Sequence, residues 1–258
     1  VGTNAFGTED PDALARIRGV LETLPQLGGR VVDTAQSYGR SEAVIGQLVQ
    51  GIGNRESLFI ATKTASRGRV SMADIDAAFA RLGVERLDLL QVHNFNETDA
   101  VMPMMLELKA QGRVRYVGCS TSRDSQYGDL KAAMSRHPLD FIQVDYSIDN
   151  RSAADEILPL ARDRGIAVLG NMPFGGRRNA SSTFSRVAEV ELPDWAGDID
   201  VNSWAQFFLK YSVSHPAMTV AIPGTTKPHH LEDNLGAARG RLPDAAMRLE
   251  MERLWDSI

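Results

Sequence analysis

Short apolar runs alternate with amphipathic stretches along the whole chain. The stretches repeat apolar residues at helical spacing, as Leu14, Ile17 and Leu21 do. The runs are rich in Val, Ile and Leu, and we expect strands at residues 1–4, 30–33, 58–62, 87–92, 114–119, 141–145, 166–170 and 219–222. Strands that alternate with helices are typical of βα units and a parallel sheet. The pattern predicts an α/β fold, a single (β/α)8 TIM barrel that forms one catalytic domain over residues 1–258.

Local signals sharpen some boundaries. Ser71, followed three residues later by Asp74, predicts the start of a helix, and Gly83 predicts its end. Residues 173–202 lack a clear period and are too long for a routine connection, which indicates a lid or a binding loop. Because the chain begins at Val1 inside its first predicted strand and has no initial Met, we expect a further segment before it.

Composition excludes several classes of partner. The net charge of −5 gives no basic surface for nucleic acid or an anionic membrane. No apolar run approaches the roughly 20 residues of a membrane span. The single cysteine, Cys119, excludes an internal disulfide framework and a Cys-rich metal site, so we expect no metal. Cytoplasm is the default location, a removed export signal stays open, and a monomer is the default state.

Four residues of different chemistry stand at the carboxyl ends of three successive predicted strands. They are an acid, a phenol, an amine and an imidazole: Asp33, Tyr38, Lys63 and His93. In a parallel barrel the carboxyl ends of the strands surround the ligand site. A free phenol has a pKa of about 10, and a neighbouring ammonium stabilises its phenolate. This set therefore suits the protonation of an oxygen that develops negative charge, as in the reduction of a carbonyl.

Each residue also has a simpler interpretation when it is taken alone. Asp33 could cap a turn, Tyr38 could be a packing residue, and His93 could be a hydrogen-bonded core histidine. Lys63 is harder to dismiss, because an ammonium at the end of an apolar strand is costly unless it is paired. The shared position of all four at one end of the barrel favours function.

A second cluster follows the last predicted strand. It reads I-P-G-T-T-K-P over residues 222–228 and leads into a helix. Barrels commonly bind phosphate at this place through backbone N–H groups at the start of a helix. A simple βα turn with a solvated lysine is the competing interpretation.

These phrases together resemble the aldo-keto reductase family over nearly the full chain. The matching motifs, in the family's order, are D-T-A-Q-S-Y-G-R-S-E, A-T-K-T, Q-V-H-N, V-G-C-S-T, I-Q-V-D-Y-S and I-P-G-T-T-K-P-H-H-L-E-D-N-L. The resemblance implies that Asp33, Tyr38, Lys63 and His93 are the catalytic residues and that Tyr38 is the general acid. It also implies NADPH as the cofactor, with NADH possible, and a small carbonyl compound as the substrate.

The resemblance further implies a set of dinucleotide-binding residues. They are Gly2, Thr3, Asn4, Ser120, Thr121, Gln143, Asn171, Pro223, Gly224, Thr225, Lys227, His230, Asp233 and Asn234. Three of them depart from the commonest pattern of the family. Asn171 stands where an aromatic ring often stacks on nicotinamide, and Thr121 replaces a frequent Asn. His230 replaces an Arg that often holds the 2′-phosphate of NADP, so the preference for NADP over NAD stays open.

Two other functions stay open at this stage. The chain could be a regulatory subunit that senses NADP(H) without turnover, or a Schiff-base aldolase that uses Lys63 as its nucleophile. The substrate is not readable from the sequence. Phe6, Phe95 and Phe174 are candidates for an apolar substrate pocket, although each could simply pack in the core.

Overall fold

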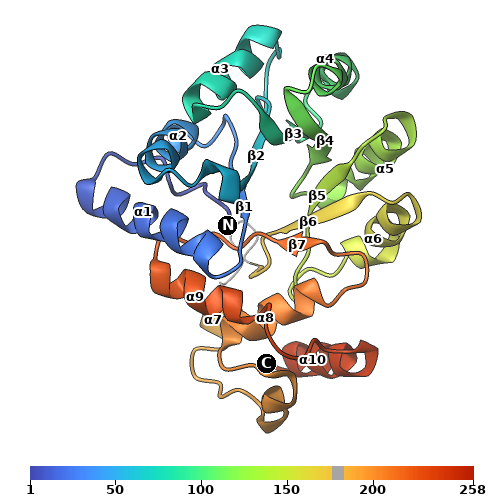
Figure 1. Ribbon diagram of the computed structural model, residues 1–258. Helices are drawn as coiled ribbons and strands as arrows, with labels where there is room; N and C mark the ends of the chain where they lie inside the picture. Colours follow the sequence, from blue (N-terminus) through green and yellow to red (C-terminus); the bar gives the residue numbers. More distant parts are fainter. Residues whose placement is uncertain (176–182) are drawn as a thin grey trace.

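Parallel strands follow one another around a curled sheet in the computed structural model (Figure 1). The structure describes residues 1–175 and 183–258, and within them seven strands lie in sequence order. They are β1 (Val31–Asp33), β2 (Phe59–Lys63), β3 (Leu87–His93), β4 (Val114–Ser120), β5 (Phe141–Asp145), β6 (Ala167–Asn171) and β7 (Val220–Ala221). These strands confirm the predicted ones to within two residues at each end.

The sheet closes through a single residue near the start of the chain. Gly2 forms parallel bridges with Asp33 on one side and with Gly224 on the other. The strand that we expected at residues 1–4 is thus reduced to one bridge. The chain leaves the sheet at once because the N–H of Phe6 donates to the carbonyl of Thr3 and makes a turn. The predicted (β/α)8 barrel is confirmed, with the bridges of Gly2 in place of the first of the eight expected strands.

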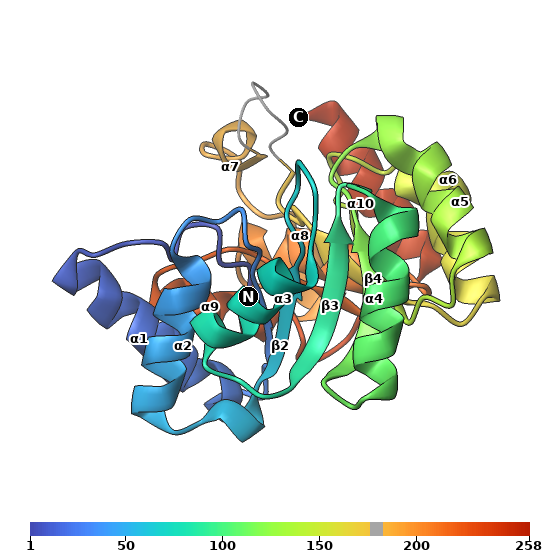
Figure 2. The ribbon, with the colours of Figure 1, turned by 90° about the horizontal axis from the view of Figure 1, so that it is seen from above.

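Helices surround the strands on all sides (Figures 1 and 2). The longer ones are α1 (Pro11–Gln26), α2 (Ser41–Ile52), α3 (Met72–Leu82), α4 (Thr98–Ala110), α5 (Tyr127–Arg136), α6 (Ala153–Asp163), α8 (Trp204–Val213), α9 (Pro228–Gly236) and α10 (Ala245–Ser257). The short ones are η1 (Arg55–Ser57), η2 (Asp124–Gln126), α7 (Thr183–Arg186) and η3 (Asp194–Ile199). The arrow of β3 points toward the side of the molecule that carries α7 (Figure 2).

The ends of α3 follow the predicted signals. The hydroxyl of Ser71 accepts from the N–H of Asp74, and the carboxylate of Asp74 accepts from the N–H of Ser71, which makes a capping box. Gly83 ends the helix in the left-handed region with φ of 64°. Glycine suits this position because it has no Cβ to oppose a positive φ.

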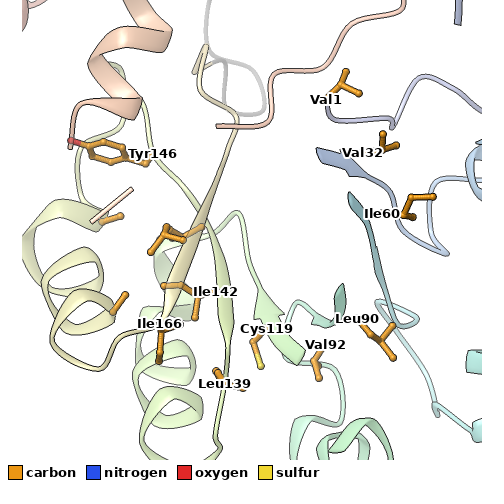
Figure 3. Close-up of a cluster of buried hydrophobic side chains, with 14 of the residues drawn as sticks. Val1, Val32, Ile60, Leu90, Val92, Cys119, Leu139, Ile142, Tyr146 and Ile166 are labelled. Carbon is orange, nitrogen blue, oxygen red and sulfur yellow. The ribbon is translucent and has the colours of Figure 1, made fainter. Parts of the chain in front are cut away.

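The main hydrophobic core lies between the strands and the helices. Alternate strand residues such as Val32, Ile60 and Leu90 point outward into it and are buried (Figure 3). The free Cys119 is also buried there, as expected for a small apolar filler. Alternation of side chains along each strand leaves the intervening residues for the inside of the barrel.

A smaller apolar cluster fills the inside of the barrel toward the amino ends of the strands. Its buried members are Ala61, Leu89, Leu169 and Ile222. Phe59, Tyr116 and Phe141 pack against them. The ring centroid of Tyr116 lies 5.4 Å from that of Phe141 and 6.2 Å from that of Phe59. These three rings close the amino end of the barrel.

An aromatic corner, defined as Trp195, Trp204, Phe207, Phe208 and Trp255, lies between α8, α10 and the segment after β6. The segment 173–202, which we expected to be irregular, contains α7 and η3, while residues 176–182 lie outside the described part of the chain.

Two side chains of α7 contact the aromatic corner. The guanidinium of Arg186 stacks over the ring of Trp255 at 3.7 Å and donates to its carbonyl. The ring of Phe184 contacts that of Phe208, with 5.7 Å between centroids.

Candidate active site

A buried ion pair lies where β1 and β2 end. Asp33 pairs with Ala61 in the sheet, and Lys63 is two residues beyond Ala61, so its side chain points to the same side, into the barrel. Its Nζ donates to Oδ1 and Oδ2 of Asp33 at 2.8 and 2.7 Å, and to the carbonyl of Thr34 at 2.8 Å. Lys63 and Asp33 are 1% and 2% exposed. Three acceptors therefore match the three N–H bonds of an ammonium.

Two glutamines extend this ion pair across the barrel. The Nε2 of Gln143 donates to Oδ2 of Asp33 at 3.3 Å, and the Nε2 of Gln91 donates to Oε1 of Gln143 at 2.9 Å. Gln91 pairs with Lys63 in the sheet, so the chain of hydrogen bonds returns to the neighbour of the lysine. This arrangement holds the carboxylate in one orientation toward Lys63.

Tyr38 and His93 face each other beside the ion pair. The Nζ of Lys63 lies 5.3 Å from the ring centroid of Tyr38. The rings of Tyr38 and His93 meet edge to face, with 6.2 Å between centroids and 87° between planes. Tyr38 is half-buried in the loop between β1 and α2, next to Gly39, whose φ of 59° favours glycine. The four residues from three strand ends are thus brought together.

The imidazole of His93 is held in its neutral form. Burial first, and then the positive charges of Lys63 and Arg123, together lower the pKa of His93 to about 4. The hydroxyl of Ser37 lies 3.3 Å from Nδ1 of His93. When this hydroxyl donates to Nδ1, the proton of the neutral ring is on Nε2, where it is available to an acceptor in the cavity.

A cavity of about 770 Å³ opens above these four residues. Its wall includes the whole predicted catalytic set together with Gly2, Thr3, Asn4, Ser120, Thr121, Gln143, Asn171 and Gly224 from the predicted cofactor set. A volume of this size is typical of sites for small molecules and cofactors. Gly2 lies close to the backbone of Ile222, since a Cβ built on Gly2 would be 3.1 Å from the carbonyl oxygen of Ile222.

One part of the cavity wall offers the groups that a carboxamide needs. The Nδ2 of Asn171 donates to the carbonyl of Thr121 at 3.1 Å, and its Oδ1 is buried without a hydrogen-bond partner among the described residues. Buried polar atoms are rarely left unpaired unless a ligand or water completes them. Asn171, Ser120 and Gln143 therefore fit the carboxamide end of a nicotinamide by residue chemistry.

The remaining predicted cofactor residues lie after β7, outside the wall of this cavity. They are Pro223, Thr225 and Lys227 in the loop and His230, Asp233 and Asn234 on α9. The carboxylate of Asp233 accepts from the hydroxyl of Ser203 at 2.8 Å and from Nε2 of Gln206 at 2.8 Å, which ties α9 to α8. His230 is exposed, and its pKa is lowered by partial burial and then by the charges of His229 and Lys227.

The three candidate pocket phenylalanines are placed differently from one another. Phe174 lines the cavity. Phe6 is fully buried in the main core and does not reach the cavity wall, because the turn after Thr3 directs it inward. Phe95 is half-buried and packs against the same core. Of the three candidates, Phe174 is thus the one that stands in the wall of this cavity.

Several cavity residues did not emerge from the sequence reasoning. They are Ser37, Ser66, Arg67, Arg123 and Gln126. Gln91, beneath the cavity, was also missed. The signal for Gln91 was present: it is two residues before His93 in an apolar strand and so shares the side on which His93 lies. Gln126 ends the short η2 and the others stand in loops, where no periodicity indicates direction.

Two further findings concern metals and membranes. In the described ranges, no three His, Cys, Asp or Glu side chains are grouped so that they could hold a metal ion. Over those same residues, no helix has both the length and the apolar character that crossing a bilayer requires.

The chain is similar to known proteins along nearly its full length. A family model described as the aldo/keto reductase family matches residues 1–252. A probable aldo-keto reductase 1 from Glycine max is 28% identical over 255 residues, which are 84% of this chain and 72% of the relative. The NADH-specific methylglyoxal reductase of Escherichia coli (strain K12) is 24% identical over 280 residues, covering 87% of this chain and 83% of the relative.

A solved structure agrees at the level of the fold. It is an aldo/keto reductase from Klebsiella pneumoniae in complex with NADP and acetate, with a TM-score of 0.75, 20% identity, and coverage of 99% of this chain and 90% of that chain. The match of the family model is the stronger finding, because it spans residues 1–252 of this chain. The chain therefore belongs to the aldo/keto reductase family, whose members are NAD(P)H-dependent oxidoreductases.

Proposed function

We propose that this protein reduces an aldehyde or a ketone to an alcohol with NADPH, with NADH as a possible second cofactor. One observation carries the proposal: a buried ammonium, fixed by Asp33, lies 5.3 Å from the ring centroid of a half-buried tyrosine at the edge of a cavity. The neutral imidazole of His93 faces the same tyrosine.

The dinucleotide, when bound, supplies the hydride that reduces the carbonyl carbon. The chain's own residues supply the proton and the orientation. Tyr38 gives its hydroxyl proton to the carbonyl oxygen, and the charge of Lys63 stabilises the phenolate that remains. His93 donates from Nε2 to the same oxygen and orients it. Asp33 keeps Lys63 charged and in place through two hydrogen bonds.

The cofactor's nicotinamide end would be held by Asn171, Ser120 and Gln143, whose amide and hydroxyl groups reach one side of the cavity. Its phosphates and adenosine would follow Gly224 toward the start of α9, where Thr225 and Lys227 lie. Backbone N–H groups at the beginning of a helix favour negative charge, which supports this direction.

The choice between NADPH and NADH depends on the region around α9. The Escherichia coli relative is named NADH-specific, and the Klebsiella pneumoniae structure is described with NADP. An exposed, neutral His230 holds a 2′-phosphate less firmly than an arginine does. Lys227, three residues before it, supplies a positive charge, and we retain NADPH as the first cofactor.

The two rival functions receive no support from the site. A Schiff-base aldolase needs a neutral amine as nucleophile. The Nζ of Lys63 instead donates to three oxygen acceptors at 2.7–2.8 Å, an arrangement that suits an ammonium. A sensing subunit has no need for a charged lysine directed at a tyrosine in the wall of its own cavity.

We propose a cytoplasmic monomer with one catalytic domain that acts on a small carbonyl compound and not on nucleic acid. The net charge of −5 supports the exclusion of nucleic acid, and a free, buried cysteine is compatible with a reducing compartment.

The substitution Tyr38→Phe tests the proposed function. It removes only the hydroxyl, so NADPH affinity measured by titration calorimetry should stay the same while kcat falls by a factor of about 10²–10⁴ with simple aldehydes. The matched control is Tyr127→Phe, which removes a phenol outside the cavity and should keep full turnover. Undiminished reduction by Tyr38→Phe would remove Tyr38 from the mechanism.

A further inference from the structure

Two arginines give the cavity an excess of positive charge. Arg67 and Arg123 both line it, and among the described residues in its wall Asp33 is the one carboxylate. Asp33 is already bound to Lys63. Neither arginine forms an ion pair with an acidic side chain of the part of the chain that the structure describes. The charge of these two guanidinium groups is therefore not neutralised within that part.

The two arginines flank the loop that carries His93. Arg67 stands in the loop from β2 to α3, and Arg123 in the loop from β4 to η2. β2 and β4 are the neighbours of β3 on its two sides, and His93 ends β3. The positive charge of Arg123 also contributes to the low pKa of His93, as the smallest of its three causes.

Hydrogen bonds fix both arginine loops to the loop between them. On one side, Nδ2 of Asn96 donates to the carbonyls of Ala65 and Gly68 at 3.1 and 2.7 Å, which holds the turn that contains Arg67. On the other side, Nε2 of Gln126 donates to the carbonyl of Asn94 at 3.1 Å.

The turn at Arg123 is held in the same way. Oε1 of Gln126 accepts from the hydroxyl of Thr121 at 2.6 Å, and that hydroxyl accepts from the N–H of Arg123 at 3.0 Å. The backbones of both arginines are thus positioned before any ligand binds.

The loop that follows β3, residues 94–97, has an unfavourable backbone conformation. Asn94, Phe95 and Glu97 all have φ between 52° and 58°, a region that side chains oppose. Such backbone persists only where the surrounding contacts determine it, and it is concentrated at functional sites. Glu97, an acid of this loop, accepts from the N–H of Val70 at 2.8 Å and does not line the cavity. It therefore leaves the charge of Arg67 available.

We propose that Arg67 and Arg123 bind an anionic group, a carboxylate or a phosphate, on the carbonyl compound that this enzyme reduces. The inference rests on the proposed reductase function. The guanidinium group is a planar fork of N–H donors that matches the oxygens of carboxylate and phosphate. The substrate class is thus an aldehyde or ketone that carries an acid group, with its carbonyl at Tyr38 and its anion between the two arginine loops.

Matched substrate pairs test the charge directly. With NADPH, kcat/KM is measured for 4-carboxybenzaldehyde against its methyl ester, and for glyceraldehyde 3-phosphate against glyceraldehyde. Charge-assisted hydrogen bonds predict a preference of about tenfold to a hundredfold for the anionic member of at least one pair. A preference in the first pair identifies a carboxylate, and one in the second identifies a phosphate.

Arginine variants test whether Arg67 and Arg123 cause the preference for the anionic substrate. Arg67→Gln and Arg123→Gln should each raise KM for the preferred anion about tenfold more than for its neutral partner. Lysine at either position should restore part of the difference. The matched control is Arg69→Gln, which removes the same charge from an exposed residue of the same loop that does not line the cavity, and it should leave both KM values unchanged.

Three outcomes overturn the inference. Equal kcat/KM within both pairs, with all four compounds reduced, refutes the anionic substrate and leaves the reductase intact. Weaker NADPH binding in Arg67→Gln and Arg123→Gln, measured by calorimetry, assigns these arginines to the dinucleotide instead. Failure to reduce any carbonyl compound refutes the proposed function, and the inference with it.

Discussion

The two ends of the barrel interior are built from the same strands but from opposite kinds of residue. On β2, Phe59 and Ala61 belong to the apolar cluster, and the next inward residue is Lys63. On β5, Phe141 is apolar and the next inward residue is Gln143. The change from aromatic ring to buried polar network takes place within two to four residues of one strand.

This difference indicates that stability and chemistry are divided along each strand. At the amino end, ring packing and burial of apolar surface stabilise the fold. At the carboxyl end, charged and amide groups are buried at a cost, which is offset by hydrogen bonds among Lys63, Asp33, Gln143 and Gln91. Substitutions at the two ends should therefore affect different measured quantities.

The largest effect is expected at the carboxyl end. Lys63→Met leaves the carboxylate of Asp33 buried without its counter-charge, so the free energy of unfolding should fall by about 3–5 kcal/mol. Turnover of the folded fraction should fall by a factor of about 10²–10⁴. Urea denaturation and steady-state kinetics measure the two effects.

A double variant separates the two quantities. Asp33→Asn combined with Lys63→Met removes both charges and should recover much of the lost stability without recovering turnover. If turnover returned together with stability, the network would be structural only, and the comparison between the two ends would be wrong.

The amino end should show the reverse behaviour. Phe141→Ala removes a ring that packs against Phe59 and Tyr116, with a cost to the free energy of unfolding of about 3–5 kcal/mol. Because Phe141 does not line the cavity, kcat and KM of the protein that stays folded should match those of the unaltered enzyme. If kcat fell strongly under conditions in which the variant is fully folded, the division of stability and chemistry between the two ends would be contradicted.

The smallest effect concerns pH and sharpens the contribution of His93. Its pKa is about 4 in the folded protein and 6.5 for the free group, so the unfolded chain binds more protons at acidic pH. This contribution to stability is fully present above pH 6.5 and is lost as the pH falls toward 4. Between pH 7 and pH 5 the loss is about 1–2 kcal/mol, after allowance for partial exposure.

The measurement is the difference between the unaltered protein and His93→Gln in urea denaturation at the two pH values. The variant should lack this part of the acid destabilisation. His215, whose pKa is also lowered to about 4, titrates in both proteins and cancels in the difference. An identical pH response in the two proteins would show that His93 is not protected from protonation by the fold.

The sequence allowed most of the barrel to be predicted, because βα units carry strong local signals. The boundaries of β5 and of α3 followed from an apolar run and from Ser71, Asp74 and Gly83. The start of the chain behaved differently, since a single residue, Gly2, is enough to close the ring when partners exist on both sides. Such pairing is a tertiary effect that local propensity does not record.

For the site, strand positions were informative and loop positions were not. Asp33, Lys63 and His93 each end a strand, so the direction of their side chains followed from alternation. Phe6 follows a turn instead of a strand, so alternation gave no direction for its ring, which packs in the core. Arg67 and Arg123 were not anticipated for the same reason, since side-chain hydrogen bonds from Asn96 and Gln126 position their loops.

The aromatic corner has a consequence for spectroscopy. All three tryptophans of the chain belong to it: Trp195 in η3, Trp204 at the start of α8, and Trp255 in α10, where Arg186 stacks over its ring. Intrinsic tryptophan emission therefore reports on the packing of the segment after β6 and is insensitive to the barrel interior. An experimenter can follow the local environment of that segment during ligand binding without attaching a dye.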